Sequence, residues 1–224
     1  MATSIIYKST AIYELIMLAL YGRHYPSRYR AIAELIPPGS NVLELCCGPS
    51  ILFRRYLKPK RVQYTGIDLN EKFVRQVIRC GGTGLLMDLR EDQPLPAADY
   101  VIMQGSLFHF LPDASRIINR ISQAARKQVI IAEPVRNFAS CRWRPLAWVA
   151  AHLTNPGVGP QSSRFTEESL NHLFSSYRPL ISHVSLVAGG REMMFVLDVQ
   201  TSPDCRADYT KMVLEGSVKS FQPR

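Results

Sequence analysis

The chain has 224 residues, 46% of them hydrophobic, which is enough for one α/β domain with a full core and a small appendage. No apolar run reaches the ~18 residues of a membrane span and no signal peptide opens the chain, so we expect a cytoplasmic protein. The net charge of +9 permits nucleic acid, anionic membranes or acidic substrates as partners, but the scattered basic residues make nucleic acid an unfavoured one. The five cysteines form no C-x-x-C pair and no cluster with zinc spacing, so no metal site is expected.

Two helices are predicted at the start of the chain. Residues 4–20 carry apolar side chains at helical spacing, and Tyr21-Gly22 ends this pattern. Ser27 can cap a second helix that runs to Ile36, where Pro37-Pro38 stops it.

A short strand, a turn of small residues and a helix follow. Val42–Leu45 is β-branched and aliphatic, residues 46–50 are mostly small, and Ile51–Leu57 has a helical pattern. Small side chains at such a turn let a ligand and the helix both approach the backbone. This order is typical of the first unit of a nucleotide-binding α/β domain.

Two later strands end in acidic residues. Tyr64–Asp68 places a carboxylate twenty residues after Gly48, where it can accept hydrogen bonds from the hydroxyls of an adenosine ribose. Leu85–Leu89, after a predicted loop over residues 81–84, contains Asp88. A nicotinamide fingerprint is a poor match, because Cys46 and Ile51 stand where its outer glycines belong, and no phosphate-binding P-loop occurs.

The remaining chain continues the alternation of strands and helices. The predicted helices are 71–79, capped by Asn70, then 113–125 and 166–177, and the predicted strands are 99–103, 128–132, 181–187 and 193–199. Such alternation predicts a parallel sheet, while Gly189-Gly190-Arg191 between the last two strands predicts a hairpin that brings in one antiparallel strand. Residues 136–163 hold Trp143 and Trp148 and are either a substrate lid or a surface helix packed by its tryptophans.

The segment Val42-Leu43-Glu44-Leu45-Cys46-Cys47-Gly48-Pro49-Ser50 resembles the first motif of class I S-adenosylmethionine-dependent methyltransferases, commonly V-L-E-L-G-C-G-x-G, with Cys46 and Ser50 replacing the first and last glycines. With the later motifs, the resemblance covers roughly residues 40–200. It implies a Rossmann-like fold: a seven-stranded, mostly parallel sheet with a C-terminal antiparallel β-hairpin and helices on both faces. It also implies S-adenosylmethionine as cofactor and S-adenosylhomocysteine as product.

The resemblance assigns cofactor roles to individual residues. Cys46 and Gly48 would meet the methionine part through their backbone, and Glu44 would orient that turn. Asp68 would bind the ribose and Leu69 would pack on the adenine. The rest of the adenosyl group and the sulfonium would contact these residues: Asp88, Leu89, Gln104 and Gly105.

On the acceptor side, the segment Gly105–Asp113 looks like the one that borders the methyl-transfer site in this family. His109 is a candidate general base, with a structural histidine as the alternative. Glu133, after the fifth strand, is a candidate for binding a cationic amine. Three residues of the N-terminal helices are candidates for substrate contact, with packing as the alternative: Tyr13, Tyr21 and His24.

The expected organisation is 1–36 as N-terminal helices capping the pocket, 37–200 as the cofactor-binding domain with 136–163 as candidate lid, and 201–224 as a C-terminal tail. The expected function is methyl transfer to an oxygen or nitrogen of a small organic acceptor, mainly by proximity and orientation. Two alternatives remain open: a lipid-amine methyltransferase with peripheral membrane contact, and a non-catalytic methyltransferase-like binding protein. The oligomeric state is left undetermined.

Overall fold

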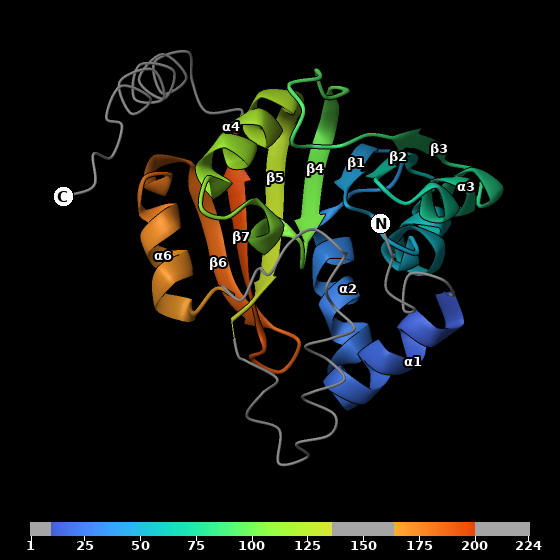
Figure 1. Cartoon of the computed structure of the whole chain (residues 1–224), viewed down its shortest axis with the longest axis horizontal. Coiled ribbons are helices and arrows are strands. Elements are labelled where there is room, and N and C mark those ends of the chain that lie inside the picture. The colour runs from blue at the N-terminus through green and yellow to red at the C-terminus, as the bar shows by residue number, and fades with distance from the viewer. Residues whose placement is uncertain (1–9, 136–163, 200–224) are drawn as a thin grey trace.

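The computed structural model describes residues 10–135 and 164–199, and these form a seven-stranded sheet with helices on both sides (Figure 1). The strand order is β3-β2-β1-β4-β5-β7-β6. The strands are β1 (Asn41–Leu45), β2 (Gln63–Asp68), β3 (Thr83–Leu86), β4 (Ala98–Gln104), β5 (Ala125–Pro134), β6 (Ile181–Val187) and β7 (Glu192–Asp198). The predicted candidate lid, 136–163, and the predicted tail, 201–224, lie outside the described residues.

The pairing confirms the predicted fold class. Strands β1 to β5 pair in parallel, so their carboxyl ends meet at one edge of the sheet. Strand β7 is antiparallel to both of its neighbours, β5 and β6, which makes it the one reversed strand of the C-terminal hairpin.

The helices cover both faces of this sheet. They are α1 (Thr10–Tyr21), η2 (Gly22–His24), α2 (Tyr25–Leu35), η3 (Phe53–Leu57), η4 (Lys58–Lys60), α3 (Glu71–Arg79), η5 (Leu107–Phe110), α4 (Ala114–Ala124), α6 (Glu167–Ser175) and η7 (Arg178–Leu180). One hydrophobic core contains buried residues of α4, α6 and η5, and a second contains those of α2, η3 and α3. In Figure 1, α2 lies beside the carboxyl end of β4, which places the N-terminal helices at the edge where the parallel strands end.

Local side-chain chemistry explains where several helices begin. Asn70 caps α3 by accepting a hydrogen bond from the Lys72 backbone, as predicted. Thr166 and Ser169 form a reciprocal capping box at the start of α6. Helix α2 begins at Tyr25, two residues earlier than predicted, because Pro26 is tolerated in a first helical turn and Ser27 bonds the His24 carbonyl instead of capping.

The third strand differs from its predicted position. It spans Thr83–Leu86, so Gly84, which was expected in a loop, lies inside it. The reason is close packing against α3, since a Cβ added to Gly84 would lie 2.5 Å from the Val74 carbonyl oxygen. Asp88 therefore follows the strand by two residues, whereas Asp68 is the last residue of β2.

We expect Gly84→Ala to destabilise the protein by about 2 kcal/mol, because the Val74 backbone must move to admit the new methyl group. Gly81→Ala is the matched control: its φ of +90° strains any other residue, but an added Cβ there would have no heavy atom within 4 Å. Urea unfolding of both variants measures the difference. A Gly84→Ala variant no less stable than the wild type would mean that contact with α3 does not restrict this position, whose φ is not left-handed.

Candidate functional site

The turn after β1 is built from three residues with left-handed backbone conformation. The φ angles are +53° at Cys46, +53° at Gly48 and +56° at Ser50. Glycine adopts this conformation without strain, whereas other residues adopt it at a cost of ~1 kcal/mol or more. This difference explains why the motif V-L-E-L-G-C-G-x-G has glycine at these three positions. The chain therefore keeps the shape of the turn with Cys46 and Ser50 in place of two glycines.

Asp68, at the end of β2, holds this turn in place. Its carboxylate accepts a hydrogen bond from the Gly48 N–H at 2.9 Å and another from the Asn70 N–H at 2.8 Å. Burial raises the pKa of the Asp68 carboxyl, and the backbone N–H groups that bond it oppose this rise. The Leu69 N–H also bonds this carboxylate, which has about four acceptor positions in all and can therefore still accept a hydrogen bond from a ligand.

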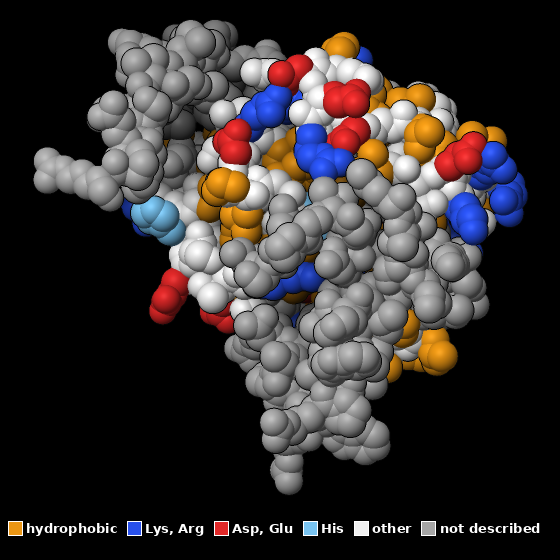
Figure 2. Space-filling view, viewed as in Figure 1, with side chains coloured by type: hydrophobic (Ala, Val, Ile, Leu, Met, Phe, Trp, Pro, Cys, Tyr) orange, Lys and Arg blue, Asp and Glu red, His pale blue; other side chains and the backbone are white. Residues whose placement is uncertain are grey.

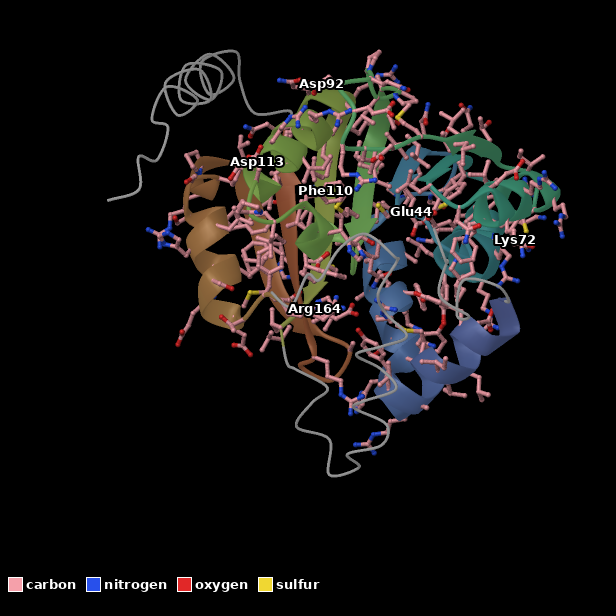
Figure 3. All side chains as sticks on the ribbon, viewed as in Figure 1. Glu44, Lys72, Asp92, Phe110, Asp113 and Arg164 are labelled. Carbon is pink, nitrogen blue, oxygen red and sulfur yellow. The ribbon has the colours of Figure 1, made fainter. Side chains whose placement is uncertain are left out.

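Glu44, labelled in Figure 3, lies in β1 on the same face of the sheet as Val42, whose hydrophobic core also contains residues of η3. It is buried and accepts a hydrogen bond from the Tyr64 hydroxyl at 2.5 Å. Burial raises the pKa of its carboxyl to about 7, and the nearby charge of Asp68 acts in the same direction.

The residues predicted to contact the adenine follow strands β2 and β3. The Asp88 carboxylate accepts three hydrogen bonds from the Arg90 guanidinium: from Nε to Oδ1 at 2.9 Å, from Nε to Oδ2 at 3.1 Å and from Nη2 to Oδ2 at 2.6 Å. These bonds lower the pKa of the Asp88 carboxyl. Leu89 is buried, whereas 55% of the surface of Leu69 is exposed next to Asp68, so Leu69 offers an apolar surface to a flat ring.

A buried ion pair brings the N-terminal helices and the C-terminal hairpin to the end of β4. Arg28 Nη2 lies 2.7 Å from Glu192 Oε1, and both side chains are almost completely buried. Gln104 Nε2 donates to Glu192 Oε2 at 3.1 Å and to the Arg28 carbonyl at 3.2 Å, and the Tyr21 hydroxyl donates to Glu192. Gly105 has a φ of +63°, and a Cβ added there would lie 3.3 Å from the Arg28 guanidinium.

The predicted substrate residues of the N-terminal helices surround this ion pair. The Tyr21 ring contacts the Arg28 guanidinium, with 4.6 Å from the guanidinium carbon to the ring centroid. Tyr13 is close enough to Arg28 for the cation to oppose the rise that burial causes in its pKa. His24 packs on the hairpin turn, since a Cβ on Gly189 would lie 2.7 Å from its ring.

Glu133 fixes the segment that follows β4. Its Oε1 accepts hydrogen bonds from the Ser106 and Leu107 N–H groups, each at 2.6 Å, and the side chain is fully buried. Burial raises the pKa of its carboxyl to about 8 despite these two donors. Among the described residues Oε2 has no hydrogen-bond partner.

His109 and Arg164 both contact the Phe108 ring. The ring centroids of Phe108 and His109 are 3.8 Å apart, and the Arg164 guanidinium carbon lies 3.5 Å from the Phe108 centroid. Burial, together with the charges of Arg164 and Arg90, lowers the pKa of His109 to about 4. His109 is therefore neutral at neutral pH.

We expect the stability of the protein to fall as the pH rises from 6.5 to 8. The carboxyls of Glu44 and Glu133 retain protons in the folded state up to about pH 7 and 8, whereas the unfolded chain releases them near 4.5. Each group thus stabilises the fold fully below pH 4.5 and loses this contribution, about 3 kcal/mol for Glu44 and about 5 kcal/mol for Glu133, as the pH rises from 4.5 through its folded pKa. His109, with its lowered pKa, has the opposite effect and acts below pH 6.5.

Urea unfolding across this pH range measures the decline. In Glu44→Gln the slope between pH 6.5 and 8 should be clearly smaller, while the exposed Glu34→Gln should leave it unchanged. A wild-type stability that stays constant or rises over this range would contradict the assignment of neutral buried carboxyls.

Sequence reasoning did not select Arg28, Glu192, Ser106 or Arg164. A signal existed for Arg28, because Tyr21, Tyr25 and Tyr29 recur at four-residue spacing and mark one buried helix face on which an arginine is unexpected. Glu192 had a weaker signal, as the acidic first residue of an apolar strand. Contacts of Ser106 and Arg164 depend on tertiary structure alone.

The comparisons with known structures place this fold among S-adenosylmethionine-dependent methyltransferases. Magnesium protoporphyrin IX methyltransferase from Synechocystis PCC 6803, with bound SAM, aligns with a TM-score of 0.56 and 14% identity over 86% of this chain and 93% of that chain. A putative methyltransferase in complex with the Haloferax volcanii Trm112 methyltransferase activator aligns with a TM-score of 0.62 and 14% identity, over 89% and 99%. A possible histamine N-methyltransferase from Thermotoga maritima aligns with a TM-score of 0.59 and 13% identity, over 87% and 98%.

The fold is thus that of the class I S-adenosylmethionine-dependent methyltransferases, as the sequence resemblance predicted. A family model described as "Methionine biosynthesis protein MetW" matches residues 27–155, and the chain belongs to this family. No curated protein matches the chain. Within residues 10–135 and 164–199, no helix is long and apolar enough to cross a membrane, and no cluster of three or more His, Cys, Asp or Glu residues could hold a metal ion.

Proposed function

We propose that this protein binds S-adenosylmethionine in the cytoplasm and transfers its methyl group to an oxygen or nitrogen of a small organic acceptor, releasing S-adenosylhomocysteine. The observation that carries the proposal is the contact between Asp68 and Gly48, which holds a carboxylate and a left-handed turn together at the carboxyl edge of the sheet. Ligands of open α/β sheets bind at this edge, where neighbouring crossovers diverge.

The cofactor residues follow the edge of the sheet in order. Cys46 and Gly48 would contact the methionine part through their backbone, and Asp68 would accept hydrogen bonds from the ribose. Leu69 would cover one side of the adenine, and Asp88 with Leu89 would contact its edge. Gln104 and Gly105 would face the sulfonium from the end of β4. We also propose the domain organisation that the sequence predicts: residues 1–36 cap the pocket of a cofactor-binding domain that spans residues 37–200.

The proposed methyl transfer would need no covalent catalyst. The sulfonium is already activated, so the protein must hold the acceptor in line with the methyl group and keep water away. Segment η5 is suited to this task, because Glu133 holds the backbone N–H groups of Ser106 and Leu107, where the segment begins.

Calorimetric titration with S-adenosylmethionine and with S-adenosylhomocysteine tests cofactor binding. We expect both to bind, and a methyl-labelled cofactor to pass its label to a small-molecule fraction. If neither compound binds at millimolar concentration, the proposal is wrong.

A non-catalytic role is a second candidate, because Cys46 and Ser50 occupy left-handed positions of the turn where glycine is common. Their side chains reduce the space beside the backbone that the methionine part would approach. Binding of the cofactor without label transfer to any acceptor would favour this second candidate over the enzyme.

A further inference from the structure

We infer that Arg28 binds the carboxylate of the cofactor's methionine part through its Nε–H, and that this contact makes the protein selective for cofactors that carry the carboxylate. The inference rests on the proposed function. It adds a charged side chain of an N-terminal helix to a cofactor site whose other members come from the edge of the sheet. No role in cofactor binding follows for Arg28 from the sequence resemblance.

Arg28 is only 3% exposed, yet one of its hydrogen-bond donors has no partner. Its Nη2 is paired with Glu192 Oε1 at 2.7 Å, and its Nη1 donates to the Tyr29 hydroxyl at 3.3 Å. Its Nε is buried, and no described residue accepts a hydrogen bond from it. Buried N–H groups in proteins almost always have an acceptor, because leaving one unpaired is costly. An acceptor supplied by a ligand would satisfy this nitrogen.

The Arg28 guanidinium lies beside the end of β4, next to the turn that follows β1. Its Nη2 would be 3.3 Å from a Cβ added to Gly105, and helix α2 lies beside the carboxyl end of β4 (Figure 1). Leu45 of β1 pairs in parallel with Met103 of β4, so Gly105 and the turn that begins at Cys46 both lie just past this pair. The guanidinium therefore borders the space in which we place the methionine part.

The electrostatic effects of Arg28 agree with this position. Burial raises the pKa of the Glu44 carboxyl in β1, and the charge of Arg28 opposes this rise. The pKa of Tyr13 is affected by the charge of Arg28 and also by that of Asp68, the residue proposed to bind the ribose. The guanidinium is thus near the end of β1 as well as the end of β4.

The ion pair with Glu192 leaves the Nε–H of Arg28 available. Glu192 Oε1 contacts Nη2 and accepts from the Tyr21 hydroxyl, and its Oε2 accepts from Gln104 at 3.1 Å. These contacts fix the guanidinium and offset the cost of burying its charge. The methionine part offers two charged groups, an ammonium that only donates and a carboxylate that only accepts. A donor on a cation can pair only with the carboxylate.

The surface of the protein does not supply this selectivity. On the face shown in Figure 2, Lys and Arg side chains are interspersed with Asp and Glu side chains. Charges in water are also screened over ~10 Å at 0.1 M salt, whereas a buried charge is screened much less. We therefore assign recognition of the carboxylate to Arg28 and not to the net charge of +9.

The test compares two cofactors that differ only in the carboxylate, S-adenosylmethionine and its decarboxylated form, by calorimetric titration of the full chain. We expect the wild type to bind S-adenosylmethionine about tenfold more tightly, because a charged hydrogen bond is lost with the carboxylate. 5′-Methylthioadenosine, which lacks the amino-acid part, reports on the adenosine site. Equal affinity for the two sulfonium compounds would overturn the inference and leave the proposed function intact. Failure of all three compounds to bind would overturn the proposed function as well.

Variants connect the preference to the guanidinium. Arg28→Lys keeps a cation for Glu192 but removes Nε, so it should weaken binding of S-adenosylmethionine about tenfold and that of the other two compounds by less than about twofold. Glu192→Gln breaks the same ion pair but keeps the guanidinium, so it should retain the preference for the carboxylate. Arg30→Lys, at an exposed position of the same helix, is the matched control and should change none of the three affinities.

A purely structural role of Arg28 would give a different pattern. If the side chain only supports the fold, Arg28→Lys should weaken all three compounds alike. Loss of the preference in a folded Glu192→Gln variant would mean that the ion pair, and not Nε, causes it. Either result would contradict the inference. If Arg28→Lys does not fold, the comparisons with the wild type and Glu192→Gln decide the question.

Discussion

Asp68→Ala is expected to bind S-adenosylmethionine at least 100-fold more weakly than the wild type. In the proposed complex the carboxylate accepts two ribose hydroxyls, and hydrogen bonds to a charged group contribute about 1.5–3 kcal/mol each. Since 1.4 kcal/mol corresponds to a factor of ten, losing both bonds exceeds two orders of magnitude in Kd. The variant also releases the Gly48 N–H, which loosens the turn itself. Calorimetry with the cofactor measures the effect.

Two further variants test whether the loss of cofactor affinity is specific to the Asp68 carboxylate. Asp68→Asn keeps one carbonyl oxygen as acceptor and should lose less affinity than Asp68→Ala. Asp92→Asn removes an exposed carboxylate that pairs with Arg116 and should leave the Kd unchanged. A folded Asp68→Ala variant with wild-type affinity would mean that the ribose does not bind at the end of β2.

Arg28→Met is expected to destabilise the protein by about 3–5 kcal/mol, because it leaves the Glu192 carboxylate buried without its cation. Tyr21 and Gln104 would still donate hydrogen bonds to that carboxylate but would not neutralise its charge. Urea unfolding at neutral pH measures the loss.

The double variant Arg28→Met with Glu192→Leu separates charge from packing. Replacing a whole buried ion pair with apolar side chains is often close to neutral, so the double variant should be more stable than Arg28→Met alone. Arg75→Met breaks an exposed pair with Glu71 and should cost less than about 0.5 kcal/mol. A double variant as unstable as the single one would show that the aromatic packing around Arg28, and not the charge, dominates.

Much of the fold was predictable because the signals are local. The alternation of apolar strands and amphipathic helices gave the order of the elements, and Asn70 and Thr166 marked helix starts by their capping chemistry. The position of Asp68 followed from the strand that precedes it. The contact between Asp68 and Gly48 depends on two parallel neighbouring strands, which the alternation already implied.

The rest depends on contacts between distant parts of the chain. Tyr21 and Glu192 are 171 residues apart in sequence, and neither carries a local sign of the other. The early start of β3 depends on how closely α3 approaches Gly84. The direction of the Glu133 side chain towards the Ser106 and Leu107 backbone also follows from tertiary packing and not from its place after a strand.

The position of β7 has a consequence for synthesis on the ribosome. This strand, among the last described residues to be translated, lies between β5 and β6, so the nascent polypeptide exposes an unpaired β5 edge until residue 198 has left the exit tunnel. Glu192 is part of β7, so the ion pair between Arg28 and Glu192 cannot form during the same interval. Ribosome-bound chains that stop before Glu192 should therefore be open to proteases and chaperones, and compaction should come late and in a single step.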